Sequence, residues 1–380
     1  MVVAKVSHCY DAIVVGAGPA GSTTARELVR AGLSVLLLDS KSFPRDKPCG
    51  GGLTPRAWRQ LSVPIDDIIL HRATSVQVRA GSRFSARFHS REAAIWMVSR
   101  RDLDLRLAEV AAEDGVEMHD SESVSSVELG QEPAVVTDRG RYRTQVLIGA
   151  DGAESRMARW LGIDRPRRWM VALEGEVGVV GDPLKGEAIV DLSIPQGYAW
   201  VFPKGDRYNI GIGSFDPRCA RGLRERLRSF VDGLALPLER PLIPVGHRIP
   251  TGLPRGPLHA GNALLVGDAA GAADPFFAEG ISYALLTARL AADAVVAYLS
   301  GRSADLSPYT RVVRGLLGAD VQRWRATAAV VHRFPAFCVR LLAGSGRLQH
   351  LVERTISGEV GSSKLSTDSC RRFADGRPAC

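Results

Sequence analysis

The chain has 380 residues, enough for two hydrophobic cores or one discontinuous pair of domains. Its 45% hydrophobic and 24% charged residues are typical of a globular protein and exclude a disordered chain. The formal net charge is +8. We expect no nucleic-acid partner, because no helix-turn-helix, aromatic RNA platform or basic tail accompanies the charge. An anionic membrane face or a diphosphate substrate fits it better, and a solvated arginine-rich surface is the alternative.

Targeting and cysteine patterns predict a cytoplasmic protein without a metal. No run reaches the roughly 18 apolar residues that cross a bilayer. No apolar segment of a secretory signal precedes Asp11. The six cysteines show neither CxxC pairs nor zinc-like spacing to the scattered histidines, so we expect free thiols.

Residues 9–60 predict a strand–loop–helix–strand unit that binds a dinucleotide. The loop 16–21 reads Gly-Ala-Gly-Pro-Ala-Gly, follows an apolar strand and opens a helix. Gly16 allows the tight turn, Gly18 lets the backbone approach a pyrophosphate, and Gly21 lets the helix pack on the strand. Unpaired N–H groups at the start of the helix would hold the phosphates. A second apolar strand ends at Asp39, where a ribose-binding carboxylate is expected.

Three later segments point to one class of dinucleotide. They are Ala-Asp-Gly at 150–152, Gly-Asp at 267–268, and Arg-x-x-Leu-Asp beginning at Arg100. With the glycine loop, they resemble the FAD-binding fold of the flavoprotein group that includes aromatic hydroxylases, halogenases and isoprenoid reductases. The resemblance implies that Asp268 binds a ribityl hydroxyl and that the helix starting at Gly280 and Ile281 points its positive end at the flavin. Arg100 would reach the flavin or its phosphates, or would be a solvated side chain at a helix end, and Asp151 would shape its own loop.

Two more segments narrow the resemblance. Lys-Pro-Cys-Gly-Gly-Gly-Leu at 47–53 and Pro-x-x-Tyr-x-Trp-x-Phe-Pro at 195–203, followed by Gly-Ile-Gly at 211–213, are similar to the two signatures of the geranylgeranyl reductase family. The similarity covers about residues 8–300. It implies an FAD-dependent enzyme that saturates trans C=C bonds of polyprenyl chains in a lipid, an isoprenoid diphosphate or an isoprenoid quinone.

The aromatic signature suggests a wall for a hydrocarbon chain. Tyr198, Trp200 and Phe202 alternate, so they share one face of a strand. Three rings with one polar group suit a long apolar substrate, although they could equally be sheet core. Many relatives carry Thr-Gly where this chain has Phe277 and Ala278, so Phe277 is expected to narrow the substrate pocket.

The glycines beside Cys49 would let the backbone approach the flavin. Cys49 itself is a flavin contact or a proton donor, and a small buried filler is the alternative. The proton for the reduced alkene would come from Cys49, Tyr198 or water. The expected cofactor-binding residues are Gly16, Gly18, Ala20, Gly21, Asp39, Cys49, Gly50, Gly52, Arg100, Val124, Asp268, Gly280 and Ile281.

Two other functions share these motifs. A monooxygenase or halogenase would use O2, and the Trp-x-Trp-x-Ile-Pro signature of halogenases is absent. An electron-transfer flavoprotein would reduce a quinone without reducing an alkene, but the iron–sulfur cysteine spacing of its larger members is absent. The electron donor could be NAD(P)H, ferredoxin or a quinol, because the sequence has no second glycine-rich unit.

We therefore expect an α/β fold: a Rossmann-type FAD-binding domain with an inserted antiparallel-sheet (α+β) substrate domain and a C-terminal helical segment. The apolar segment 326–342 is interrupted by His332, Arg333, Pro335 and Arg340. It fits an interfacial helix in peripheral contact with the inner face of the membrane, or an ordinary helix packed on the substrate sheet. The expected FAD domain comprises residues 8–67, 96–165 and 256–305; the substrate domain 68–95 and 166–255; the helical segment 306–361; and a loose tail 362–380.

Overall fold

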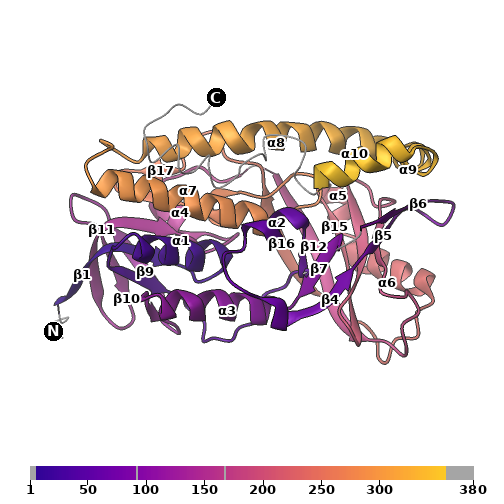
Figure 1. The fold of residues 1–380 in the computed structure, drawn as a ribbon, viewed down its shortest axis with the longest axis horizontal. Helices are drawn as coiled ribbons and strands as arrows, with labels where there is room; N and C mark the ends of the chain where they lie inside the picture. Colours follow the sequence, from indigo (N-terminus) through magenta and orange to yellow (C-terminus); the bar gives the residue numbers. More distant parts are fainter. Residues whose placement is uncertain (1–5, 91–92, 167, 357–380) are drawn as a thin grey trace.

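A computed structural model describes residues 6–90, 93–166 and 168–356 of the chain. The molecule is elongated, with one large sheet at each end and a long C-terminal helix running along the top (Figure 1). The predicted tail, with Cys370 and Cys380, lies outside the described residues.

The first sheet is built around β1, because its centre is uniformly apolar and fully buried from Ala12 to Val14. Its main order is β17-β18-β11-β1-β2-β8, parallel from β18 to β8. Two further strands, β9 and β10, extend β11 in an antiparallel direction. The bounds are β1 (Val6–Val15), β2 (Val35–Leu38), β8 (Glu117–His119), β9 (Val124–Glu128), β10 (Ala134–Thr137), β11 (Arg141–Gly149), β17 (His259–Ala260) and β18 (Ala263–Leu265).

Helix α1 (Pro19–Arg30) packs against β1, between α3 (Arg100–Glu113) and α7 (Ile281–Leu299). The sequence predicts α7 with these same bounds, and the structure confirms them. Among the described residues, α7 alone is by itself long and apolar enough to cross a membrane, and α8 with α9 would pass the same test as one bent pair. Most of α7 is buried inside the fold. The shorter elements of this half are α2 (Pro55–Gln60), α4 (Arg156–Trp160) and η2 (Gly267–Ala270).

The second sheet has the order β16-β12-β15-β14-β13-β5-β6 and is antiparallel except between β13 and β5. Helices α5 (Pro217–Ala220) and α6 (Leu223–Leu234) cover one of its faces, so its other face is turned toward the first half and the C-terminal helices. The strands are β5 (Ser75–Ala80), β6 (Phe84–His89), β12 (Arg168–Gly178), β13 (Ala188–Asp191), β14 (Gly197–Pro203), β15 (Arg207–Ser214) and β16 (Val245–Thr251).

A small third sheet joins the two halves. It has the order β3-β7-β4, with β3 (Gly52–Leu53), β7 (Ile95–Val98) and β4 (Ile69–Ala73), and the short helix η1 (Asp66–Ile68) precedes β4. Strand β3 is the end of the Cys49 glycine segment. This sheet therefore holds that segment beside the second sheet.

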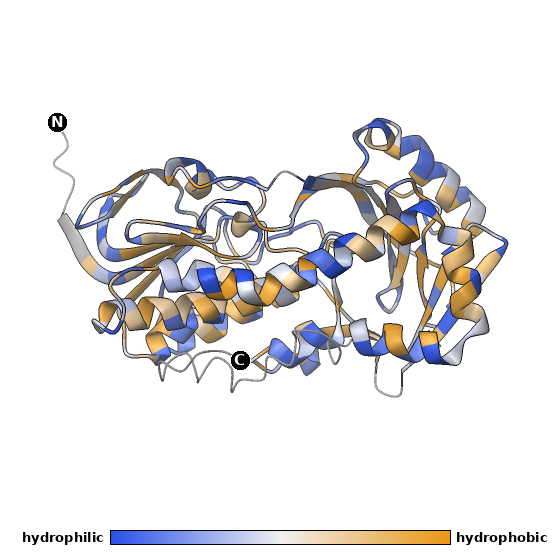
Figure 2. Cartoon of the chain, turned by 90° about the horizontal axis from the view of Figure 1, so that it is seen from above, coloured by the Kyte–Doolittle hydropathy of each residue, from blue (hydrophilic) through white to orange (hydrophobic). Residues whose placement is uncertain are grey.

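The C-terminal helices are α8 (Ser307–Arg333), α9 (Pro335–Gly344) and α10 (Gly346–Ile356). Seen from above, α8 crosses from the first half to the second (Figure 2). Helix α9 turns away from α8 by 102° and packs on β5 and β6. The chain turns there because Pro335 cannot continue the hydrogen-bond ladder of α8.

The expected α/β fold class is confirmed, with two local differences. Strand β4 pairs in the small sheet, whereas the sequence places all strands of 68–95 in the second sheet. Strand β16 forms in the proline-rich segment 237–257, for which the sequence predicts no strand. Its single proline, Pro250, is tolerated because β16 is an edge strand, where an N–H is not needed on the outer side.

The contact between the glycine loop and α1 is a test of this fold. A methyl group on Gly21 would lie 1.7 Å from the carbonyl oxygen of Gly16. We expect Gly21→Ala to lower the free energy of unfolding by about 1–3 kcal/mol or more, the usual cost of overpacking. In the control Gly318→Ala, within α8, the added methyl group meets no atom within 4 Å, so stability should rise by about 0.5–1 kcal/mol. Urea unfolding of both variants measures the difference, and an unchanged Gly21→Ala protein would contradict the close packing.

Candidate functional site

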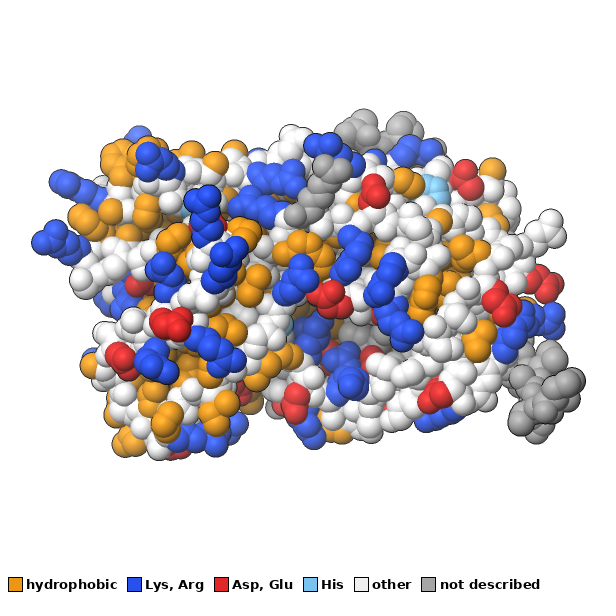
Figure 3. Space-filling model, turned by 180° about the vertical axis from the view of Figure 1, so that it is seen from behind, with side chains coloured by type: hydrophobic (Ala, Val, Ile, Leu, Met, Phe, Trp, Pro, Cys, Tyr) orange, Lys and Arg blue, Asp and Glu red, His pale blue; other side chains and the backbone are white. Residues whose placement is uncertain are grey.

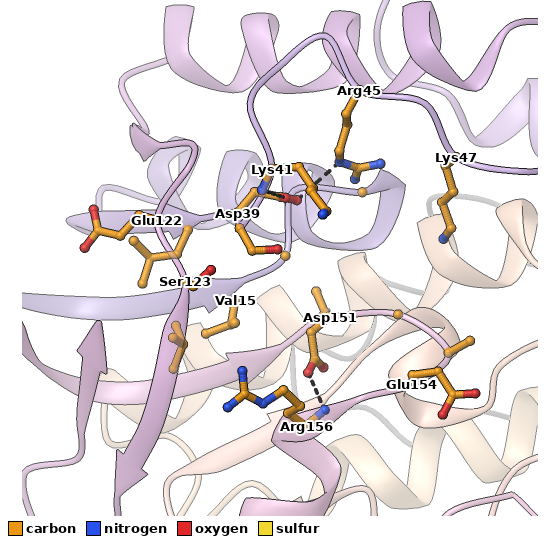
Figure 4. A pocket seen from close by; sticks show the side chains of 18 of the residues that line it. Val15, Asp39, Lys41, Arg45, Lys47, Glu122, Ser123, Asp151, Glu154 and Arg156 are labelled. Atoms are coloured by element: carbon orange, nitrogen blue, oxygen red, sulfur yellow. Dashed lines mark hydrogen bonds and ion pairs between the residues drawn. The ribbon is translucent and has the colours of Figure 1, made fainter. Parts of the chain in front are cut away.

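The largest described pocket, with a volume of about 380 Å³, lies at the carboxyl ends of β1 and β2 (Figure 4). Ligands of open α/β sheets bind at this edge. Four of the predicted cofactor residues line it: Gly16, Gly18, Asp39 and Val124. Two others, Ala20 and Gly21, are buried in the first turn of α1 and pack against the fold behind the pocket.

The pocket suits a diphosphate at its inner end. Among the described residues, no side chain caps the first turn of α1, so its N–H groups face the pocket without a side-chain acceptor. The space beside Gly18 is open, since an added methyl group would meet only an Arg45 nitrogen at 3.7 Å. Four basic side chains add positive charge to the lining: Lys41, Arg45, Lys47 and Arg156.

Asp39 stabilises the glycine loop as well as lining the pocket. Its carboxylate accepts hydrogen bonds from the backbone N–H groups of Ala17, at 2.8 Å, and Lys41, at 2.9 Å. A carboxylate has about four acceptor positions, so two remain for ribose hydroxyls. The dinucleotide fits the residues present.

The predicted role of Asp151 in its own loop is confirmed. Its carboxylate accepts the Ser155 hydroxyl at 2.5 Å and the N–H groups of Arg156 and Met157 at 2.7 and 3.0 Å. These bonds cap α4 and set one wall of the pocket.

A chain of ion pairs connects this pocket to the signature that contains Cys49. Arg45 lies 3.5 Å from Asp39 and 3.0 Å from Asp104. Asp104 is fully buried and forms two 2.8 Å hydrogen bonds with Arg100. Arg100 in turn lies within hydrogen-bond reach of Cys49. The neighbouring negative charges raise the pKa of Arg100 above the usual range, although its burial opposes this. Arg100 is therefore buried, which contradicts the solvated alternative.

The glycine segment lies against the aromatic face of β14. A methyl group on Gly50 would come within 3.0 Å of the Phe202 ring and 3.4 Å of Trp200 Nε1. One on Gly51, whose φ is +74°, would lie 2.1 Å from the Val98 carbonyl oxygen. Gly51 is therefore required by its close approach to β7, and Gly50 packs tightly on the wall, two features that the sequence does not reveal.

The start of α7 supplies the third part of the site. An added methyl group on Gly280 would lie 3.1 Å from the Asp268 carboxylate, and Lys47 lies 3.7 Å from the same carboxylate. Asp268, Gly280 and Ile281 are thus grouped as predicted, next to the first signature. Their role as cofactor contacts remains a prediction.

The loop before α7 is held by Asp274. Its buried carboxylate accepts the N–H groups of Phe276, Phe277 and Glu279 at 2.7–2.8 Å. Burial raises the pKa of Asp274 to about 6 in spite of these bonds. The loop places Phe277 edge-on against Tyr198, with ring centroids 6.0 Å apart.

Tyr198 is held by the same loop. Its hydroxyl donates a 2.5 Å hydrogen bond to the Phe277 carbonyl, and burial raises its pKa above the usual range. Both effects make the hydroxyl a poor proton donor. Among the two side chains that the sequence suggests as acids, the geometry favours Cys49.

The polar half of the same sheet face contains a buried pair that the sequence did not suggest. Glu174 on β12 is 3% exposed, and both of its carboxylate oxygens lack a hydrogen-bond partner among the described residues. The nearest base is His247 on β16, whose Nδ1 lies 4.0 Å away. Burial raises the pKa of Glu174 to about 7, and burial with the Lys47 charge lowers the pKa of His247 to about 4. Near pH 7, His247 is therefore uncharged and about half of the Glu174 carboxyl groups are ionised.

Of the other residues that the sequence analysis missed, only Asp104 had a sequence signal. It is the last residue of the Arg-x-x-Leu-Asp motif. Arg45 stands in an irregular loop, and Glu174 and His247 are brought together by the pairing of β12 with β16. Lys204, nearly fully buried, bonds Glu176 at 2.6 Å and lies against Gly51, again through tertiary contact alone.

The amino-acid sequence is similar to those of known proteins. The FAD binding domain family matches residues 9–212. A geranylgeranyl diphosphate reductase of Rhodobacter capsulatus is 33% identical over 314 residues, covering 78% of each chain. A menaquinone reductase of Mycolicibacterium smegmatis is 35% identical over 316 residues, covering 74% of this chain and 75% of that protein. An uncharacterized protein of Methanosarcina barkeri is 30% identical over 320 residues, covering 81% of each.

Solved structures match the fold over nearly the whole chain. A geranylgeranyl bacteriochlorophyll reductase-like protein of Thermoplasma acidophilum aligns with a TM-score of 0.71 and 23% identity, covering 96% of this chain and 95% of that one. A flavin-dependent brominase aligns with a TM-score of 0.74 and 21% identity, covering 97% and 100%. At these identities the likeness shows the fold alone.

The raised pKa of Glu174 predicts a pH-dependent stability. The native state must hold a buried charge above pH 7, whereas below pH 4.5 the carboxyl is neutral in both folded and unfolded chains. The stability contributed by this group is therefore complete below pH 4.5 and is lost as the pH rises through 7. The difference corresponds to about 3 kcal/mol.

We expect Glu174→Gln to gain up to this amount relative to the unmodified protein between pH 4.5 and 7.5. Urea unfolding across this range, with the exposed Glu225→Gln as control, measures it. A gain independent of pH would show that Glu174 titrates normally.

Proposed function

The chain belongs to the geranylgeranyl reductase family of FAD-dependent oxidoreductases, and we propose that it saturates trans C=C bonds of a polyprenyl chain. This polyprenyl chain is part of a lipid, an isoprenoid diphosphate or an isoprenoid quinone. These carriers are the substrates that the names of the relatives indicate.

One observation supports this proposal most strongly. The glycine segment that ends in β3 packs against Trp200 and Phe202, directly beside Cys49 and Arg100. A wall of rings thus adjoins a thiol and a cation at the junction of the two halves. An apolar chain can lie along the rings, while the polar groups are confined to one end.

The reaction adds two hydrogens. A reduced FAD, held at the pocket by Asp39 and the glycine loop, would supply the hydride for one alkene carbon. The S–H bond of Cys49 breaks and a C–H bond forms at the other carbon. The thiolate that remains faces the Arg100 guanidinium, which stabilises its charge, and a later proton from water restores the thiol.

The other residues of the site position the substrate and exclude water. An isolated alkene carries no carbonyl oxygen to stabilise, so catalysis depends mainly on orientation and a dry site. The Tyr198 hydroxyl fixes the Phe277 loop over the wall, which makes Tyr198 a positioning residue. Phe277 takes space beside the wall and restricts how the substrate end approaches.

The activity test uses the purified flavoprotein, reduced anaerobically with dithionite. Mixed with geranylgeranyl diphosphate or with a menaquinone, it should give products heavier by two hydrogens or multiples of two, detected by mass spectrometry, as the flavin reoxidises. Reaction with one carrier and not the other identifies the head group. Reoxidation without a heavier alkene product would contradict the proposal. An oxygenated or halogenated aromatic product in air would favour the monooxygenase or halogenase alternative, whose fold the brominase shares.

The proton donor is tested by single turnover with the active prenyl substrate. We expect Cys49→Ala to slow product formation by about 10²–10⁴-fold, the usual contribution of a positioned acid. Tyr198→Phe should slow it by less than about tenfold, because that hydroxyl does not release its proton. Both variants should keep their flavin absorbance. A larger loss for Tyr198→Phe than for Cys49→Ala would assign the proton to Tyr198, and small losses in both variants would assign it to water.

A further inference from the structure

An exposed apolar stripe crosses the junction of α8 and α9. Val330 and Phe334 at the end of α8, and Phe337 and Leu341 on α9, are 46–61% exposed and lie on either side of the bend between the two helices. With Leu351 on α10, they are half of the large hydrophobic side chains that are exposed among the described residues. Such a concentration marks an interaction surface, whereas scattered exposed side chains would not.

The same segment is strongly basic. Residues 322–356 contain six arginines and one acidic residue, Glu353. The arginines are Arg323, Arg325, Arg333, Arg340, Arg347 and Arg354. In Figure 3, the end of the molecule that carries α9 and α10 shows apolar side chains among Lys and Arg. Apolar residues surrounded by arginine are the composition of helices that lie in a membrane interface.

The surface is also hollowed. A groove of about 310 Å³ is lined by Phe337, Arg340, Leu341, Gly344 and Ser345. Its lining is mostly apolar and includes one guanidinium group, that of Arg340. A lipid headgroup phosphate and the start of its acyl chain have this combination of properties.

The buried side of these helices leads to the aromatic wall. Val339 of α9 is fully buried in an apolar cluster that also contains Phe276, Trp324 and Tyr198. The Phe276 ring stacks on the Trp324 ring, with the ring centroids 5.8 Å apart, and contacts the Phe277 ring, with the centroids 4.4 Å apart. Because Phe277 contacts Tyr198, one continuous apolar cluster extends from beneath the stripe to β14.

We propose that the stripe Val330–Leu341, with Leu351 and the surrounding arginines, docks the enzyme on the surface of an anionic lipid bilayer. The rings enter the interfacial layer, and the guanidinium groups of Arg340 and Arg347 pair with lipid phosphates. Docking itself needs nothing from the proposed reaction. The step in which a prenyl tail passes from the bilayer to Tyr198 rests on the proposed function.

Vesicle sedimentation of the flavin-loaded protein tests docking without any substrate. The unmodified protein should bind phosphatidylglycerol-containing vesicles more tightly than pure phosphatidylcholine vesicles, and salt should weaken this binding. The double variant Phe334→Ser, Phe337→Ser should have a partition coefficient at least tenfold lower on both types of vesicle. Arg340→Gln with Arg347→Gln should lower it roughly fivefold for each arginine on anionic vesicles only.

Matched controls lie elsewhere on the surface. Val180→Ser with Ile243→Ser removes two equally exposed apolar side chains, and Arg224→Gln with Arg228→Gln removes two exposed charges from α6. Neither control should change vesicle binding. Absent binding by the unmodified protein, or equal losses in controls and stripe variants, would overturn the proposal. So would a stripe variant that converts a dimer to a monomer in size-exclusion chromatography without changing vesicle binding.

A second readout separates docking from chemistry. In detergent micelles, where no docking is needed, stripe variants should reduce a short prenyl substrate as fast as the unmodified protein. They should be slower only when the substrate is embedded in vesicles. If neither the unmodified protein nor any variant reduces the substrate in micelles, the proposed function fails, while the vesicle-binding result still stands.

Discussion

The fully buried carboxylate of Asp104 is the contact on which the rest of the site depends. It binds Arg45 on one side and Arg100 on the other, so it connects the dinucleotide pocket to Cys49. Removing one partner of a buried pair costs about 3–5 kcal/mol, because the remaining charge stays uncompensated. One buried side chain thus fixes both Arg45, which lines the pocket, and Arg100, beside Cys49.

The second sheet is divided along its length into a polar and an apolar half. On the face toward the first half, β12 carries Glu174 and Glu176, and β16 carries His247. Glu176 is the residue that bonds Lys204. Strands β14 to β6 place rings and aliphatic side chains on the same face, under α8 and α9. This division places the charged side chains and the apolar side chains at opposite ends of one sheet face, which suits the proposed reduction of a hydrocarbon chain. The exposed stripe of α8 and α9 continues the apolar half to the molecular surface.

The loop between η2 and α7 contacts Tyr198 in the apolar half of this sheet face, and its backbone conformation is unusual. Ala278 adopts a φ of +55°, a region that favours glycine, while Asp274 accepts three backbone N–H groups around it. The loop therefore carries strain at Ala278 that the carboxylate offsets, and the result is a fixed Phe277 above Tyr198. A glycine at 278 would give the same turn without that strain.

The sequence alone determined the glycine loop, Asp39, α7 and the aromatic alternation of β14, because each depends on neighbours a few residues away. It also predicted the family, since the two signatures are contiguous. Tertiary structure alone decided that Gly51 is required beside Val98 and that Gly50 packs on Phe202, that Arg45 and Arg100 share Asp104, and that Glu174 meets His247. These contacts join residues on separate strands and loops, and strand order and register, which decide such contacts, leave no local pattern in the sequence. The same holds for the exposed stripe, because a helix pattern shows which residues share a face but not which face is covered.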